Sequence, residues 1–157
     1  MRVLPEFDAP AHVGNGWQFG ESEGKGKLAV CVNQEPWQVN YDYDFFVPIV
    51  VQDYCVEPPC GQLNPVNPHV YTTLGKLYQD FFELFDTDMF HMGGDEVNLN
   101  CWNTTKEIMD ELRQRGQTGT KEELLALWKS FQEQAAQKVS RFDYSTHITC
   151  DFIPTGV

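Results

Sequence analysis

The chain has 157 residues, of which 41% are hydrophobic, and its 23 acidic residues outnumber 11 basic ones to give a net charge of −12. Phosphate backbones repel a chain this acidic, so nucleic acid is excluded as an expected partner. No apolar run approaches the roughly 20 residues of a membrane span, and Met1 is followed by neither the basic nor the apolar region of a signal peptide.

In chain order, the hydrophobic pattern predicts a strand at residues 2–5, a long loop over 6–67, a helix over 69–85 and a second strand at 89–92. A last helix is predicted over 120–139, because apolar residues recur there at steps of three and four. These residues are Leu124, Trp128, Phe131, Ala135 and Val139. The periodicity assigns Trp128 to the core rather than to a sugar-stacking platform. Strands that alternate with helices are typical of a parallel α/β fold.

The second predicted strand ends in HMGGDEV, which places Asp95 and Glu96 side by side. On a regular strand their side chains would point to opposite faces. Gly93 and Gly94 permit the backbone bend that lets both carboxylates face one pocket. The alternative is that the pair lies in a solvated turn, since acidic turns are common.

A second loop with acidic residues and a histidine follows the first predicted strand, where RVLPEFDAPAHVGNGW carries Glu6, Asp8 and His12. Together with HMGGDEV, this passage resembles family 20 glycoside hydrolases, the β-N-acetylhexosaminidases. The resemblance extends through VCVNQEPW, YCVEPPCGQLNP and NLNCWN. The segment YCVEPPCGQ is most similar to arthropod members of the family, which include chitooligosaccharide-degrading enzymes.

The resemblance implies a TIM (β/α)8 barrel, a fold that typically needs about 250 residues. We therefore expect an α/β fold that is a partial TIM (β/α)8 barrel, with about two β/α units and a long active-site loop. Residues 1–139 are assigned to this barrel fragment and residues 140–157 to a non-homologous tail. Residues 39–52 are assigned to an insertion, in which FFVPIVV is β-prone and has no evident partner. We hypothesise that both foreign segments come from a retained intron or a mispredicted gene model.

The resemblance also assigns roles at the two strand ends. Glu96 is the expected general acid/base, Asp95 the carboxylate that orients the substrate's acetamido group, and His12 part of a hydrogen-bonded relay with Glu96. From its place within the predicted strand, His91 is expected to support the catalytic residues without contacting the substrate, with a purely structural role as the alternative. Adjacent residues, with Cα atoms about 3.8 Å apart, are poorly placed to flank a sugar from both faces. The substrate-assisted route of this family avoids that difficulty.

The substrate is expected to be an oligosaccharide ending in N-acetylglucosamine or N-acetylgalactosamine. By resemblance, Trp37 stacks on a sugar beyond the cleavage point and Val56 lines the same subsite. Glu6 and Asp8 are expected to serve as rim or hydrogen-bonding scaffold. The resemblance implies no cofactor, and it leaves dimerisation of full-length members open.

Five cysteines in an acidic chain indicate an oxidising compartment, with free buried thiols as the alternative. The resemblance implies the disulfides Cys31–Cys101 and Cys55–Cys60, and it leaves Cys150 unpaired. It also implies an extracellular or lysosomal location.

Asn103 begins an N-glycosylation sequon, Asn-Thr-Thr, which agrees with that location. Neither paired CxxC motifs nor HExxH occur, so zinc is not expected.

The expected activity is hydrolysis of terminal, non-reducing β-linked N-acetyl-D-hexosamine by substrate-assisted retaining catalysis, encoded here but not performed by this chain alone. One alternative is a non-catalytic sugar-binding or regulatory splice form, or a gene-model artefact. Another is an acidic metal site built from His12, His91, Asp95 and Glu96.

Overall fold

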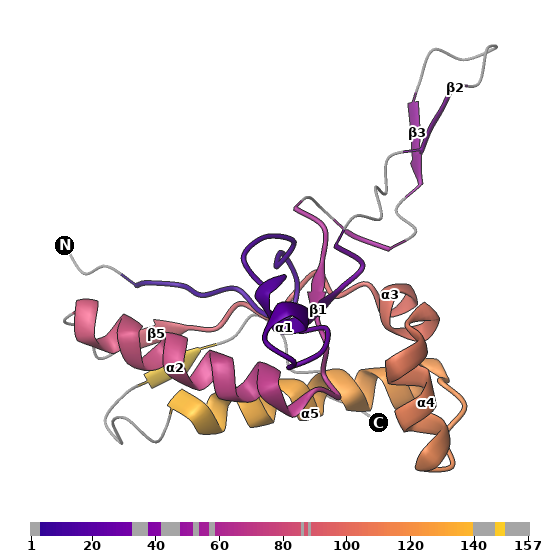
Figure 1. Cartoon of the computed structure of the whole chain (residues 1–157). Helices are drawn as coiled ribbons and strands as arrows, with labels where there is room; N and C mark the ends of the chain where they lie inside the picture. The colour runs from indigo at the N-terminus through magenta and orange to yellow at the C-terminus, as the bar shows by residue number, and fades with distance from the viewer. Residues whose placement is uncertain are drawn as a thin grey trace.

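The computed structural model describes residues 4–32, 38–41, 48–51, 54–56, 59–85, 87, 89–139 and 147–149. Its longest elements are two helices, α2 (Pro68–Leu84) and α5 (Lys121–Val139), which lie side by side in the lower part of the view (Figure 1). The described residues also form the helices α1 (Phe19–Ser22), α3 (Leu99–Thr104) and α4 (Lys106–Gln114), and the strands β1 (Ala29–Val30), β2 (Gln38–Tyr41), β3 (Pro48–Val51), β4 (Gln62–Leu63), β5 (Met89–His91) and β6 (His147–Thr149).

Helix α2 begins at a well-formed cap. The Asn67 side chain accepts the backbone N–H of His69 at 2.9 Å, and Pro68 occupies the first turn, where its missing N–H leaves no bond unmade. The buried face of α2 packs against the apolar stripe of α5 and forms one hydrophobic cluster with it. From α2 this cluster contains Val70, Leu74 and Tyr78, and from α5 it contains Phe131, Ala135 and Val139. The predicted helices over 69–85 and 120–139 are thereby confirmed.

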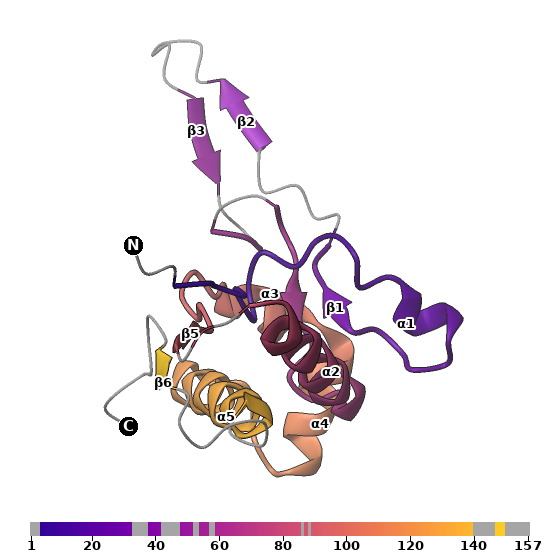
Figure 2. The same ribbon diagram turned by 90° about the vertical axis from the view of Figure 1, so that its left-hand side faces the viewer.

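Strand β5 lies between two parallel neighbours. On one side, His91 N–H donates to Pro5 O and Phe7 N–H donates to His91 O, both at 3.0 Å. On the other side, β5 pairs in parallel with β6, with Phe90 opposite Ile148 (Figure 2). The first parallel segment lies at residues 5–9, slightly later than the strand predicted at 2–5, of which residues 2 and 3 lie outside the described residues.

The predicted loop over 6–67 contains regular structure, which corrects the sequence prediction. The helix α1 lies within it, and β1 pairs with β4 antiparallel, with Ala29 opposite Leu63. Strands of two residues are too short to show an alternating pattern. Within the predicted insertion, β3 pairs antiparallel with β2, so the described part of the FFVPIVV stretch does have a partner.

A second hydrophobic cluster joins α3, α4 and the first half of α5. Its largest members are Trp102 and Trp128, with Ile108, Leu112 and Leu124 packed around them. Helix α5 therefore contributes to both clusters. None of the helices in the described residues is long and apolar enough to cross a membrane.

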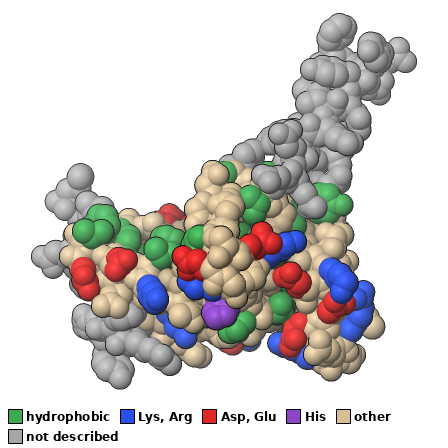
Figure 3. All heavy atoms as spheres, in the orientation of Figure 1, with side chains coloured by type: hydrophobic (Ala, Val, Ile, Leu, Met, Phe, Trp, Pro, Cys, Tyr) green, Lys and Arg blue, Asp and Glu red, His purple; other side chains and the backbone are tan. Residues whose placement is uncertain are grey.

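The surface differs between the two ends of the molecule (Figure 3). Charged side chains of both signs gather over α4, and hydrophobic side chains gather over the far end of α2. At that end Leu84 and Phe85 are exposed. The exposed ion pairs on α4 contribute little stability, since water screens them; they are Lys106–Asp110, Arg113–Asp110 and Arg115–Glu111.

Candidate active site

The loop after residues 5–9 and the loop after β5 meet at one edge of the parallel segments, because parallel neighbours end on the same side. The first loop carries His12 and the second carries Glu96. His12 Nε2 lies 2.6 Å from Glu96 Oε2, although the two residues are 84 positions apart in the sequence. Their side chains are 20% and 31% exposed, so the contact is partly shielded from water. With Glu96 ionised, the imidazole N–H donates to its carboxylate.

Both residues of this pair have unusual backbone conformations. His12 has φ of 57° and Glu96 has φ of 54°, in the left-handed region that residues other than glycine rarely occupy. Such conformations cost roughly 1–3 kcal/mol each and cluster at functional sites. The strain lies at both ends of one hydrogen bond, so the fold holds two unfavourable backbone turns in order to bring these side chains together.

The bend predicted at Gly93 and Gly94 is present, with φ of 60° and 118°. A Cβ atom at Gly93 would lie 1.9 Å from Asp8 Oδ1, and one at Gly94 would lie 2.0 Å from Gln132 Nε2. Glycine is therefore required at both positions by space as well as by φ.

Asp8 lies inside the site. Its Oδ1 accepts the N–H of Gly94 at 3.2 Å, and its Oδ2 lies 3.9 Å from His12 Nε2. Burial raises the pKa of Asp8, the Gly94 N–H and His12 oppose that rise, and the charges of Asp95 and Glu6 add to it. Of the roles predicted for Asp8, this geometry corresponds to the hydrogen-bonding scaffold.

His91 contacts the first loop from β5. Its Nδ1 lies 3.1 Å from Glu6 Oε1, and the N–H of Gly93 points to the same nitrogen at 3.3 Å. The two contacts are alternatives, because a nitrogen that carries a proton donates to Glu6 and one without a proton accepts from Gly93. His91 thus joins the first loop to the glycine bend, and its supporting role stays a prediction.

Of the two predicted sugar-binding residues, the structure describes Val56 but not Trp37. Val56 lines a small hollow together with His12 and Glu96. The described residues leave this hollow about 10 Å³, which is room for about one water molecule and not for a sugar. A larger hollow of about 810 Å³ lies elsewhere, between α1, β1 and the start of α4, and none of the predicted catalytic residues lines it. Asp95 is exposed.

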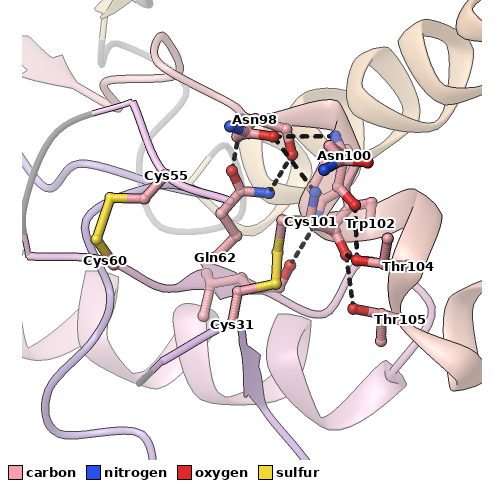
Figure 4. Close-up of a disulfide and its surroundings, with 11 residues drawn as sticks. Cys31, Cys55, Cys60, Gln62, Asn98, Asn100, Cys101, Trp102, Thr104 and Thr105 are labelled. Carbon is pink, nitrogen blue, oxygen red and sulfur yellow. Dashed lines mark hydrogen bonds between the residues drawn. A yellow bond between two sulfur atoms is a disulfide. The ribbon is translucent and has the colours of Figure 1, made fainter. Parts of the chain in front are cut away.

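Two disulfides hold the surroundings of the site (Figure 4). Cys31 is bonded to Cys101, which joins the chain just after β1 to α3, and Cys55 is bonded to Cys60. These are the pairings that the resemblance implied. Cys150 lies outside the described residues.

The chain after Glu96 is also held by side-chain hydrogen bonds (Figure 4). Gln62 on β4 donates to Asn98 O at 3.1 Å and accepts the N–H of Asn98 at 2.5 Å. The side chain of Asn98 in turn caps α3 by accepting two of its backbone N–H groups. Asn103 is exposed on α3, so the asparagine of the sequon is accessible, and its glycosylation stays a prediction.

Helix α5 supplies two residues that the sequence prediction missed. Trp128 is buried, as predicted, but its indole N–H also donates to Gly94 O at 3.0 Å. One turn further on, Gln132 donates to Ala9 O at 3.3 Å. A glutamine among the apolar residues of the stripe was the available signal, because a buried amide needs a hydrogen-bond partner.

The metal alternative lacks the geometry that it needs. The four residues proposed for it, His12, His91, Asp95 and Glu96, are all described. Among the described residues, no group of three or more histidine, cysteine, aspartate or glutamate side chains could hold a metal ion.

The fold and the two strand-end loops define a class of protein. The family model for the catalytic domain of glycosyl hydrolase family 20 matches residues 1–149 of the chain. The chain belongs to this family. The match includes residues 39–52 and runs ten residues past 139, and the division into barrel fragment, insertion and tail stays a prediction.

Several relatives are insect enzymes. The chain is 47% identical over 139 residues to the chitooligosaccharidolytic β-N-acetylglucosaminidase of Ostrinia furnacalis and 45% identical to that of Bombyx mori. Each alignment covers 88% of this chain and 20% of the relative. Human β-hexosaminidase subunit beta is 32% identical over 74% of this chain and 17% of its own length. The chain thus spans about a fifth of the length of these relatives.

A solved structure agrees on the fold. The crystal structure of a β-N-acetylhexosaminidase matches with a TM-score of 0.57 and 17% sequence identity, over 96% of this chain and 27% of the other. At this identity the likeness concerns the fold alone.

Proposed function

We propose that the chain carries the acid-base part of a β-N-acetylhexosaminidase active site, with Glu96, Asp95 and His12 in the roles given above. The whole enzyme would remove terminal, non-reducing β-linked N-acetylhexosamine from oligosaccharides. The observation that carries this proposal is the 2.6 Å contact between His12 and Glu96, which joins the ends of two neighbouring parallel segments beside a second carboxylate.

The proposed chemistry follows from the different surroundings of the two carboxylates. Glu96 is held by His12 and would protonate the leaving oxygen. Asp95 is exposed and has no such contact among the described residues, so it is free to orient the 2-acetamido group, whose oxygen attacks the anomeric carbon. The bond to the leaving sugar then breaks, and water opens the cyclic intermediate with Glu96 as base.

We propose that the parallel segments at residues 5–9 and β5 belong to a sector of a TIM barrel with about two β/α units. The hollow at His12 and Glu96 is too small to enclose a sugar, so a sugar would bind at the exposed rim beside Asp95, and we expect the isolated chain to show negligible hydrolysis. The two disulfides fit an oxidising location, which we propose to be extracellular or lysosomal for the whole enzyme.

Thermal unfolding with an N-acetylglucosamine-thiazoline, which mimics the cyclised acetamido intermediate, tests this proposal. At a hundredfold excess over the dissociation constant, bound ligand stabilises the fold by about 2.7 kcal/mol. For a chain of this size that raises Tm by roughly 5–10 °C. We expect the shift to be lost in Asp95→Asn and kept in Glu122→Gln, an exposed carboxylate at the start of α5 that serves as the control.

A shift that survives in Asp95→Asn, or no shift at saturating ligand, would contradict the proposed site. Hydrolysis of 4-nitrophenyl N-acetyl-β-D-glucosaminide is measured alongside. Release of 4-nitrophenol that disappears in Glu96→Gln would support the site and contradict the expected inactivity of the isolated chain.

A further inference from the structure

Gly94 is held from two sides. Its N–H, which belongs to the peptide group shared with Gly93, donates to Asp8 Oδ1 at 3.2 Å. Its carbonyl, which belongs to the peptide group shared with Asp95, accepts the indole N–H of Trp128 at 3.0 Å. Glycine at φ of 118° has wide conformational freedom, so these two bonds fix the peptide planes on either side of it.

The peptide plane between Gly94 and Asp95 directly precedes the two acidic residues of the site, Asp95 and Glu96. Asp95 shares it, and Glu96 follows in the left-handed conformation with its side chain on His12. A rotation of the Gly94–Asp95 peptide would therefore move both carboxylates. Such a rotation would break the bond from Trp128.

We infer that Trp128 is a positioning residue for Asp95 and Glu96, acting through the carbonyl of Gly94. The significance for catalysis rests on the proposed function, whereas the positioning itself is a property of the fold. Trp128 acts from α5, whose next turn brings Gln132 to Ala9 O at 3.3 Å. One helix therefore contacts the backbones of both loops that form the site.

The competing interpretation is that Trp128 is only a core residue whose indole needs an acceptor. Trp102 provides the comparison. It is also buried in the same hydrophobic cluster, and its indole N–H donates to a backbone carbonyl, that of Leu63, at 3.2 Å. Trp102→Phe and Trp128→Phe thus each remove one buried N–H and keep an aromatic ring, but only Trp128 is bonded to Gly94.

The test compares the two variants of the full chain by nuclear magnetic resonance. We expect Trp128→Phe to speed hydrogen exchange of the Gly94 amide about tenfold, because Gly94, once its carbonyl is released, turns more freely and the bond from its N–H to Asp8 opens more often. It should also shift the ¹⁵N resonance of His12 Nε2, which reports the contact with Glu96. Trp102→Phe should leave both signals as in the unmodified chain while lowering Tm by a similar amount.

Equal effects of the two variants on Gly94 would show general loosening of the core and overturn the inference, as would an unchanged Gly94 amide in Trp128→Phe. If Trp128→Phe fails to fold, hydrogen exchange of the unmodified chain provides the test. The Trp128 indole N–H and the Gly94 amide should then exchange with the same opening free energy. Faster, independent exchange at Gly94 would overturn the inference. The exchange signals need no sugar. A failure of thiazoline binding would therefore count against the proposed function alone.

Discussion

The two disulfides close loops of very different length, and this difference predicts how much each one stabilises the fold. Cys31 and Cys101 are separated by 70 residues, whereas Cys55 and Cys60 are separated by five. In the chain-entropy model, a crosslink stabilises by restricting the unfolded chain, and its contribution grows with the logarithm of the loop length. That relation gives about 4 kcal/mol for the long loop and about 2 kcal/mol for the short one.

The measurement is the free energy of unfolding in urea, followed by far-ultraviolet circular dichroism. The variants are the paired substitutions Cys31→Ser with Cys101→Ser, and Cys55→Ser with Cys60→Ser. Each pair contains one buried cysteine, Cys101 or Cys55, so the penalty of burying a serine hydroxyl is similar in both and largely cancels from the difference. We expect the first pair to lose about 2 kcal/mol more than the second.

A small domain has only about 5–15 kcal/mol of stability, so losing the long-loop crosslink removes a large part of it. Equal losses in the two double variants, or a larger loss from the five-residue loop, would refute the loop-length argument. In that case the effect of each disulfide would have to come from the folded state, for example from the contacts that Cys101 of α3 makes in the second hydrophobic cluster.

Three further outcomes are expected in the same unfolding assay. Gly94→Ala should lower the free energy of unfolding by about 2–4 kcal/mol, because the new Cβ would lie 2.0 Å from Gln132 Nε2 and the residue has φ of 118°. Gly116→Ala is the control, since its Cβ would meet open space and only its φ of 75° is unfavourable, and it should lose about 1 kcal/mol. Similar losses in the two variants would contradict the clash with Gln132. Burial raises the pKa of Asp8 above 3.8, so the unfolded chain loses this proton at a lower pH than the folded chain does. The free energy of unfolding should therefore fall as pH rises from 3.8 through the raised pKa. Asp8→Asn should remove that part of the pH dependence, and an unchanged pH dependence in the variant would contradict the raised pKa. Tyr78→Phe should be neutral or stabilising by about 1 kcal/mol, since the buried hydroxyl has no hydrogen-bond partner in the described structure; a loss of more than about 1 kcal/mol would show that the hydroxyl is satisfied.

The elements that the sequence predicts well are those whose signal is local. The stripe from Leu124 to Val139 repeats at helical steps, and α5 buries it as expected. The cap at Asn67 and Pro68 similarly marks the start of α2. In contrast, β1 and β4 have two residues each, and their pairing depends on chain segments more than 30 residues apart.

The site could be predicted in its residues but not in its geometry. The glycines before Asp95 indicate a bend, and the structure has that bend. The contact between His12 and Glu96 spans 84 positions, and no local pattern encodes it; the family resemblance supplied the pairing. Trp128 was recognised as a core residue from its periodicity, but its bond to Gly94 depends on how α5 docks against β5, which is a tertiary property.

Helix α5 holds the backbone on both sides of the His12–Glu96 contact, so the stability of the fold and the geometry of the site depend on the same helix. Both residues occupy left-handed backbone conformations, and such turns persist only when surrounding contacts over-determine them. Gln132 bonds the carbonyl of Ala9 ahead of His12, and Trp128 bonds the carbonyl of Gly94 ahead of Glu96. The second half of α5, which includes Gln132, is packed on α2, so the apolar packing that fixes the position of α5 also fixes the separation of the two loops. The core and the candidate active site are therefore stabilised by the same helix, and packing changes along α5 act on both.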